Sequence, residues 1–495
     1  MITQNKKHFI FVNLAIKSGY YSVNHGIAFL VPVVKREDYN VTVINLFHHI
    51  SSEKFKNQIL KLKPSIVGFS STTVQLRYLI YYAKVLRDIP NLLLIAGGVG
   101  PSLQPEFFLK QSGVNGVHIG EGEKNLANLL QKIDKGEDIF QTEGFCWAQN
   151  NGIIKNPVPP LTEDLSAFSF PDYRTFPREI VVRSDGQLKM MLSRGCLFKC
   201  TYCCNEALSK LYPSSKHYFR IPSVEYCISL LKKMVEDYPE VRSIDFQDDN
   251  LVANHKWFLD FAEAYREEIK LPYCILAKPE SVNESMVRVL RESGCSKVNV
   301  GLESGSEIVR KNILNRPMSN EAFIKKAKLI KDGGLELFTF NIVGFPDETV
   351  EQIKETAQLN KIIDADDGVC TFFYPFPETE LYRKAKDKGI LLDESELMNI
   401  TNYLTMPGLK LNKDVLKVCK DMQKELKNFF IQQHCKRLFA KYSKGKKSIF
   451  NWFYWLIVYT TSWLKWNARK FPIIYFASYY LAKLKYRSKH IFNSR

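Results

Sequence analysis

Two series of short apolar runs that alternate with helix-like stretches constrain the fold of this chain more than any other feature. The first series occupies residues 8–135 and the second occupies residues 189–400. Strands that alternate with helices form parallel sheets covered by helices. The second series contains six strand-like runs, at 189–194, 242–247, 272–276, 297–302, 337–343 and 368–373. We therefore predict an α/β protein with a doubly wound parallel sheet followed by a partial (β/α)6 barrel of the TIM type.

The chain of 495 residues is too long for a single hydrophobic core, so it is expected to divide into domains. We expect the doubly wound domain at 8–135, a linker at 136–188, the barrel at 189–400 and a helical C-terminal region at 401–495. The linker is inferred from a loose pattern that contains Pro157, Pro159, Pro160, Pro171 and Pro177.

Three cysteines, Cys196, Cys200 and Cys203, follow the first predicted barrel strand. The chemistry of such barrels lies at the carboxyl ends of their strands, and thiolates are the preferred ligands of iron–sulfur clusters. A [4Fe–4S] cluster held by three cysteines keeps one iron free for a small chelating ligand. Structural zinc with Cys204 or His217 as the fourth ligand is the alternative, although zinc motifs usually consist of two separated pairs. Cys204 is otherwise expected to be a spare thiol.

The strand ends of the first series carry small, hydroxyl or acidic residues. Ligands of doubly wound sheets bind beyond the carboxyl ends of the strands, and small residues let a flat polar ligand approach the backbone. The residues expected to face such a ligand are Ser70, Ser71, Thr72, Gly97, Gly98, Glu121 and Gly122. No Gly-x-Gly-x-x-Gly motif follows the first predicted strand, so a dinucleotide site is not favoured.

The spacing Cys-x3-Cys-x-Tyr-Cys of residues 196–203 resembles the signature of radical S-adenosylmethionine (SAM) enzymes. Later segments resemble strand motifs of the same family in the expected order, at 245–250, 294–306, 341–349 and 374–380. Gly97-Gly98 and residues 120–123, placed before such a barrel, resemble the cobalamin-binding domain of the B12-dependent branch. The chain thus resembles radical SAM enzymes that carry a cobalamin (B12)-binding domain.

This resemblance implies three cofactors: a [4Fe–4S] cluster on the three cysteines, SAM and cobalamin. The residues it assigns to SAM are Tyr202, Asp248, Asp249, Glu303 and Gly344, and it implies no catalytic residue beyond the cluster ligands. When the Asp-x-His-x-x-Gly loop of B12 proteins is aligned on Gly26, Tyr21 and Val23 occupy the acid and histidine positions. We therefore expect base-off cobalamin without a protein histidine ligand, and expect His25 to cap or pack. The alternative is a sheet that has lost cobalamin and survives as a scaffold.

The resemblance implies reductive cleavage of SAM and hydrogen abstraction from an unactivated carbon, followed by methyl transfer, cyclisation or rearrangement. A small-molecule or lipid-like substrate, such as an isoprenoid or a tetrapyrrole, and a reductase or flavodoxin-type electron donor are the expected partners. Two alternatives remain: an RNA-modifying enzyme of the methylthiotransferase type, and a regulatory protein that binds metal or cobalamin without turnover.

The C-terminal tail carries most of the net charge of +17, because no acidic residue follows Glu425. Residues 448–464 hold no charge and are rich in Trp and Tyr, a composition typical of the lipid interface. We expect residues 436–495 to lie on a membrane surface. A helical cap on the barrel is the main alternative, and the long uncharged stretch argues against nucleic acid. With clustered thiols and no visible secretory signal, the chain is expected in the cytoplasm, peripheral to the membrane where the tail binds it.

Overall fold

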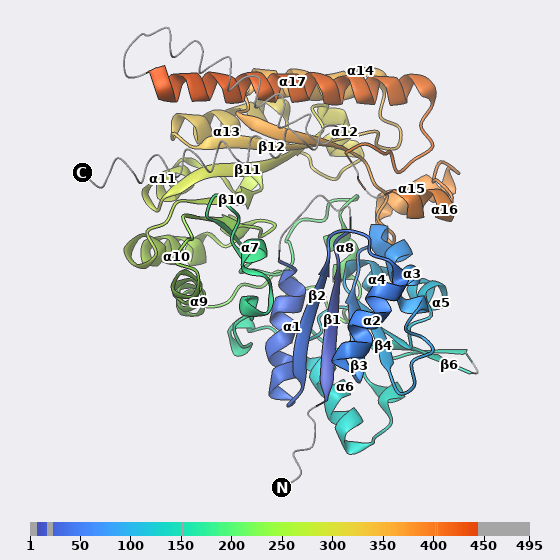
Figure 1. Ribbon diagram of the computed structural model, residues 1–495. Coiled ribbons are helices and arrows are strands. Elements are labelled where there is room, and N and C mark those ends of the chain that lie inside the picture. Colours follow the sequence, from blue (N-terminus) through green and yellow to red (C-terminus); the bar gives the residue numbers. More distant parts are fainter. Residues whose placement is uncertain (1–6, 17–22, 151, 401, 403, 444–495) are drawn as a thin grey trace.

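The computed structural model describes the chain apart from residues 1–6, 17–22, 151, 401, 403 and 444–495. The described residues form one sheet of seven strands and one of six. Figure 1 shows the first in the N-terminal half, coloured blue to cyan, and the second in the C-terminal half, coloured green to orange. The predicted membrane segment falls almost wholly on residues outside the described part. Within the described part, no helix combines the length and the apolar composition needed to cross a bilayer.

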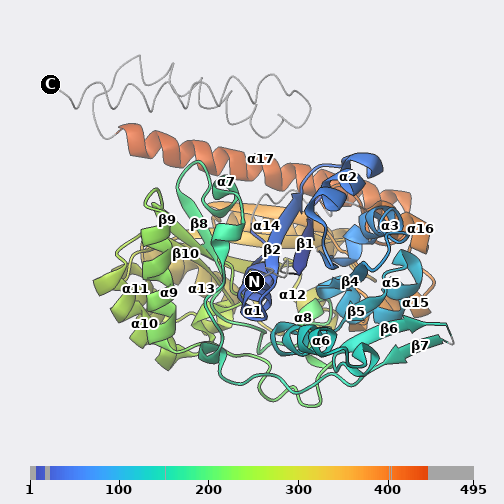
Figure 2. The same cartoon turned by 60° about the horizontal axis from the view of Figure 1, so that its bottom comes forward.

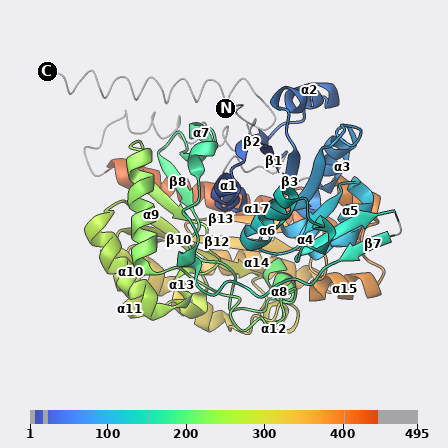
Figure 3. The same cartoon turned by 90° about the horizontal axis from the view of Figure 1, so that it is seen from below.

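The N-terminal sheet is doubly wound, as predicted. Its strand order is β2-β1-β3-β4-β5-β6-β7, and β1 to β5 are parallel. Its parallel strands and main helices are β1 (His8–Leu14), α1 (His25–Arg36), β2 (Asn40–Leu46), α2 (Ser52–Leu62), β3 (Ile66–Ser70), α3 (Leu76–Lys84), β4 (Leu93–Gly97), α5 (Pro105–Ser112), β5 (Gly116–His118) and α6 (Glu123–Lys135). Because side chains alternate along a strand, Phe9 and Phe11 pack with α1 and α6, whereas Ile10 and Val12 pack with α2, α3 and α5. Figure 3 shows these two sets of helices on opposite faces of the sheet.

The linker prediction for 136–188 is wrong in part. A hairpin of β6 (Phe145–Gln149) and β7 (Gly152–Lys155) extends the sheet, with β6 antiparallel to β5. Trp147 is fully buried, and a Cβ at Gly116 would lie 2.4 Å from its ring. The apolar residues of β6 therefore cover the end of the core, while the five prolines that suggested a linker all follow the hairpin.

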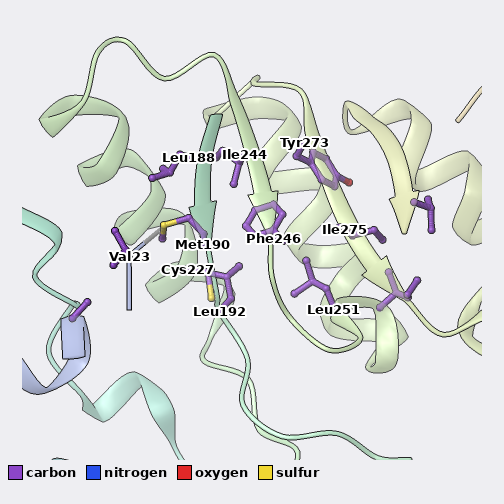
Figure 4. Packing of buried hydrophobic residues seen from close by; sticks show 14 of the residues in the cluster. Val23, Leu188, Met190, Leu192, Cys227, Ile244, Phe246, Leu251, Tyr273 and Ile275 are labelled. Carbon is purple, nitrogen blue, oxygen red and sulfur yellow. The ribbon is translucent and has the colours of Figure 1, made fainter. Parts of the chain in front are cut away.

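The C-terminal sheet is a parallel half-barrel, as predicted, with the order β13-β12-β11-β10-β9-β8. Its strands are β8 (Gln187–Met190), β9 (Ser243–Phe246), β10 (Tyr273–Ala277), β11 (Cys295–Glu303), β12 (Glu336–Val343) and β13 (Asp367–Phe372). Figure 2 shows helices on its outer side, including α9 (Val224–Asp237), α10 (His255–Glu268), α11 (Glu284–Glu292) and α13 (Asn320–Asp332). Leu188 and Met190 of β8 are paired with Ile244 and Phe246 of β9, and all four side chains are buried in the same core (Figure 4).

The C-terminal region is helical, as predicted, and closes one edge of the half-barrel. Within the described part of the predicted range 401–495 lies α17 (Lys413–Ser443), while α15 (Glu380–Asp387) and α16 (Glu394–Asn399) precede it, inside the range predicted for the barrel. Helix α17 lies along α14 (Val350–Ile362) and β13 (Figure 1). The remaining short α-helices are α4 (Val99–Leu103), α7 (Arg178–Val181), α8 (Cys204–Ser209) and α12 (Glu307–Asn312).

Candidate active site

A cavity of about 420 Å³ lies between the two sheets, where the carboxyl ends of β3, β4 and β5 face the loop after β8. Phe9, Phe11 and Ile95 form part of its apolar wall, and residues 191–194 form the side nearest the half-barrel. The structure brings to this one cavity all seven residues that the sequence placed at the ligand edge: Ser70, Ser71, Thr72, Gly97, Gly98, Glu121 and Gly122.

At Gly98 the wall of the cavity is formed by backbone, without a side chain. Its φ is +107°, and a Cβ at this position would lie 2.6 Å from the carbonyl oxygen of Ser71. The turn after β4 therefore rests directly on the turn after β3, and a side chain at Gly98 has no room. A broad cavity with apolar walls and bare backbone at its rim fits a large, flat ligand such as cobalamin.

Replacing Gly98 by alanine is expected to weaken cobalamin binding roughly ten- to hundredfold, because overpacking costs about 1–3 kcal/mol. Binding of hydroxocobalamin, followed by visible absorbance, measures the effect. Gly136→Ala is the matched control, since Gly136 also has a positive φ but nothing lies within 4 Å of the added Cβ. Equal affinities of the two variants would show that the Gly98 turn does not shape the site.

Two histidines line the cavity, the buried His118 and the partly exposed His25, and only His25 was considered from the sequence. The His25 Nδ1 lies 2.9 Å from the Tyr173 hydroxyl, so this ring packs as expected. The His118 Nε2 lies 3.2 Å from Asn125 Nδ2. Burial lowers the pKa of each imidazole to about 4, so both rings are neutral at pH 7. Val23, which occupies the histidine position of the aligned loop, is a buried apolar residue and supplies no ligand.

The three candidate cluster ligands lie on the loop that follows β8. Cys200 is buried, Cys196 and Cys203 are partly exposed, and all are free thiols. Burial raises the pKa of the Cys200 thiol, and the nearby Lys278 and Arg316 charges partly oppose this. The Lys278 Nζ lies 3.6 Å from the Cys200 sulfur. Lys278 was not identified from the sequence, because it follows β10, far along the chain.

The donor set on this loop suits a cubane cluster better than a single ion. Among the described residues, no three His, Cys, Asp or Glu side chains converge closely enough to hold one metal ion. Zinc motifs usually consist of two separated pairs, whereas this loop carries three thiols in one run, the number that a [4Fe–4S] cluster with one open iron needs. The residues that would hold the cluster are therefore Cys196, Cys200 and Cys203.

Asp248 and Asp249, both assigned to SAM from the sequence, differ in environment. Asp248 is buried, and its carboxylate accepts hydrogen bonds from the Ser193 N–H and hydroxyl and from the Leu192 N–H. This carboxylate therefore positions the start of the cluster loop. Asp249 is exposed, and Asn205 Nδ2 donates to it at 2.9 Å. Of the two carboxylates, Asp249 is the one open to a ligand.

Glu303 and Tyr202 lie together, joined by a residue that the sequence did not indicate. The Arg316 Nη1 lies 3.0 Å from Glu303 Oε1 and 3.5 Å from the Tyr202 hydroxyl. Glu303 has a φ of +64° at a bulge in β11, and Gly301 leaves the room that its carboxylate occupies. A non-glycine residue held at positive φ is strained, and such strain clusters at functional sites.

Gly344 lies at the end of β12 but has little free space beside it. A Cβ at this position would lie 3.0 Å from Leu411 Cδ1, so the C-terminal region fills that side. The Gly344 N–H donates to Glu348 Oε2 at 2.7 Å, and the Phe345 N–H donates to the same atom at 3.2 Å. Glu348 therefore holds the turn that follows β12. Burial raises the pKa of this carboxyl from 4.5 to about 7.

Glu348→Gln is expected to change how stability depends on pH. Between pH 4.5 and 7 the folded protein keeps a proton on Glu348 that the unfolded chain releases, so stability falls as pH rises. The loss amounts to about 3 kcal/mol and is complete above the folded-state pKa. Urea unfolding at pH 5 and pH 7.5 isolates this contribution as a difference: between these pH values the wild-type chain should lose about 3 kcal/mol of stability relative to the variant. Other titrating groups, such as His25 and His118, contribute equally to both proteins. The same pH dependence in both proteins would contradict the shifted pKa.

Comparison with known families gives two matches along the chain. Residues 13–130 match the B12 binding domain, and residues 190–359 match the Radical SAM superfamily. The two matched segments coincide with the sheet that lines the cavity and with most of the half-barrel.

Curated relatives match this chain over most of their length. An uncharacterized methyltransferase of Pyrococcus horikoshii is 28% identical over 393 residues, which cover 78% of this chain and 83% of the relative. The anaerobic magnesium-protoporphyrin IX monomethyl ester cyclase of Rubrivivax gelatinosus is 22% identical, with coverages of 74% and 67%.

Solved structures share the fold. The cobalamin-dependent SAM radical enzyme OxsB, with aqua-cobalamin and SAM bound, has a TM-score of 0.68 and 17% identity, covering 92% of this chain and 71% of that one. The methyltransferase TsrM of Kitasatospora setae, with cobalamin and a [4Fe–4S] cluster bound, has a TM-score of 0.63 and 15% identity, with coverages of 79% and 80%. The fold and the two matched families agree: the chain belongs to the B12-binding-domain radical SAM enzymes, whose cofactors are a [4Fe–4S] cluster, SAM and cobalamin.

Proposed function

We propose that this chain is a cobalamin-dependent radical SAM methyltransferase that acts on a small-molecule or lipid-like substrate. The observation that carries the proposal is that the cavity suited to cobalamin opens onto residues 191–194, which lead directly into the cluster cysteines. When bound, the cluster would supply the electron for reductive cleavage of SAM, and cobalamin would carry the methyl group that is transferred. The relatives named as methyltransferases support this reaction class.

The residues of the chain have distinct roles in this proposal. Cys196, Cys200 and Cys203 hold the cluster, and Asp248 fixes the backbone from which they extend. Asp249 is the exposed carboxylate proposed to contact SAM. Three further residues that the sequence assigns to SAM are also proposed as SAM contacts: Tyr202, Glu303 and Gly344. Glu303 is paired with Arg316 and would form a polar wall of the SAM site, whereas Gly344 lies in a closely packed turn.

Ring formation is the second candidate reaction, because a relative at 22% identity is named as a cyclase. Methylthiolation of RNA is less favoured, although some relatives are named methylthiotransferases. The sequence has no cysteine before Cys146, so residues 1–145 cannot supply a second cluster like the separate N-terminal cysteine trio of such enzymes.

Product analysis of the reconstituted chain distinguishes these reactions. Methyl transfer is expected to yield S-adenosylhomocysteine alongside 5′-deoxyadenosine when substrate, hydroxocobalamin and a reductant are supplied. Candidate substrates should include an isoprenoid and a tetrapyrrole, the two classes that the sequence resemblance suggests. Turnover that yields 5′-deoxyadenosine without S-adenosylhomocysteine would support cyclisation or rearrangement and contradict methyl transfer.

A further inference from the structure

Two arginines of the half-barrel side and two glutamates of the N-terminal sheet form an ionic cluster beside the cavity, of which Glu123 and Arg220 are buried and Glu121 and Arg194 partly buried. The Arg194 Nη1 lies 3.1 Å from Glu121 Oε2, and Arg194 Nη2 pairs with Glu123. Both terminal nitrogens of Arg220 contact Glu121, with Nη1 3.2 Å from Oε2. We call Glu121, Glu123, Arg194 and Arg220 the clasp. Its positive and negative charges balance.

The clasp is held rigidly on its arginine side. The Arg194 N–H donates to the Arg220 carbonyl at 2.8 Å, and the Arg220 N–H donates to the Arg194 carbonyl at 2.9 Å. The Arg194 guanidinium lies 4.8 Å from the ring centre of Phe29 and 5.2 Å from that of Phe168. The Arg220 side chain is 4% exposed. A guanidinium paired in such an environment is costly to separate from its carboxylate, because a buried charge would lose its partner.

The glutamate side of the clasp is equally constrained. The Glu121 N–H donates to the Tyr212 hydroxyl at 3.0 Å, and a Cβ at Gly120 would lie 2.6 Å from that oxygen. Tyr212 belongs to the half-barrel side, between the cluster loop and Arg220. The turn 120–123 is therefore fixed by the backbone as well as by charge, so it cannot shift independently of the loop that carries the cysteines.

The clasp also connects the cavity to the cluster loop through a short segment. Arg194, Glu121 and Glu123 line the cavity, and only Gly195 separates Arg194 from Cys196. Gly195 has a φ of +78°, and a Cβ there would lie 2.2 Å from the Tyr218 carbonyl oxygen. This tight turn gives the chain no slack between Arg194 and Cys196. Any change in the position of Arg194 is passed directly to the first cysteine.

We propose that the clasp couples the two cofactor sites, so that cobalamin in the cavity and SAM at the cluster loop strengthen each other's binding. Arg194 acts as a positioning residue, because it touches the cavity and sets the backbone before Cys196. Because the turn 120–123, Arg194 and the backbone before Cys196 move as one unit, a ligand that favours one position of the turn favours the matching position of the cluster loop, and the second ligand meets a loop that is already in place. Linkage makes the effect reciprocal. This inference rests on the proposed cofactor sites and goes beyond them.

The test measures SAM affinity of the full chain with its cluster reconstituted, with and without saturating hydroxocobalamin. The wild-type chain is expected to bind SAM about five- to twentyfold more tightly when hydroxocobalamin is present, at the lower end of typical allosteric coupling. Hydroxocobalamin affinity should rise by the same factor when SAM is present. The electron paramagnetic resonance signal of the reduced cluster with SAM should also change when hydroxocobalamin is added.

Arg194→Gln is expected to reduce the coupling factor to within about twofold of unity and to remove the cobalamin-dependent change in the resonance signal. Arg178→Gln is the matched control. It breaks an ion pair of the same residue types, with Arg178 Nε 2.6 Å from Glu240 Oε1, remote from the cavity lining, and should keep full coupling. Glu123→Gln is a milder variant, because it removes only one ion pair of the clasp. It should lower the coupling factor at least about twofold, and it keeps the test possible if Arg194→Gln does not fold.

Two results would overturn the inference: equal SAM affinity of the wild-type chain with and without hydroxocobalamin, or full coupling in both clasp variants. If the two ligands bind independently, the coupling role of the clasp is rejected, while the proposed cofactor sites are unaffected. A reconstituted wild-type chain that binds no hydroxocobalamin would instead reject the proposed cobalamin site, and the inference with it.

Discussion

Replacing Cys200 by alanine is expected to abolish cluster binding and the formation of 5′-deoxyadenosine from SAM. Cys200 is the most buried of the three candidate ligands, and its sulfur lies 3.6 Å from the Lys278 ammonium. Loss of one of three thiolates leaves a second iron without a protein ligand. Iron per chain should fall from about four to near background after anaerobic reconstitution, and the visible absorbance of the cluster should disappear.

Cys204→Ala is the matched control for this prediction. Cys204 directly follows Cys203 and begins α8, but it lies outside the Cys-x3-Cys-x-Tyr-Cys spacing. It is expected to keep iron, sulfide and 5′-deoxyadenosine formation close to the wild-type level. A Cys200→Ala protein that retains them, or a Cys204→Ala protein that loses them, would contradict the assignment of the ligands.

Asp248→Ala should have the largest effect on stability, lowering the free energy of unfolding by about 3–5 kcal/mol. The carboxylate accepts two backbone N–H groups and one hydroxyl, all buried, and alanine leaves these donors without partners. Because the donors belong to Leu192 and Ser193, the cluster loop should lose its anchor as well. The urea midpoint and the iron content after reconstitution should therefore fall together.

Asp249→Asn is the companion variant, one residue further along the chain. Its side chain is exposed and bonds to Asn205, so the urea midpoint and the iron content should stay near wild type. SAM affinity is expected to drop, because the negative charge open to the ligand is lost. Equal destabilisation by the two substitutions would show that Asp248 does not anchor the loop.

Features encoded by local pattern could be predicted from the sequence. The alternation of strands and helices correctly predicted two parallel sheets. The cysteine motif could be recognised because its three residues lie within one loop. The hairpin of β6 and β7 was missed because the prolines that follow it indicated a linker for the whole of 136–188. Residues 191–194 were predicted as strand, yet β8 ends at Met190, because Asp248 draws Leu192 and Ser193 into the loop.

Contacts between distant segments could not be predicted. Arg316 reaches Glu303 and Tyr202, and Lys278 reaches Cys200, from positions that no motif marks. Sequence also cannot say which of two adjacent aspartates points inward, since neighbouring side chains after a strand face opposite ways. The structure therefore distinguishes Asp248 from Asp249, which the sequence treated alike.

The most direct test of the account is SAM cleavage by the full chain after anaerobic reconstitution with iron, sulfide and hydroxocobalamin. With SAM and dithionite, the chain is expected to bind one cobalamin, hold about four irons and form 5′-deoxyadenosine. Omission of the reductant should stop its formation. A chain with a complete cluster and bound cobalamin that forms no 5′-deoxyadenosine under reduction would contradict the central claim that this protein generates radicals from SAM.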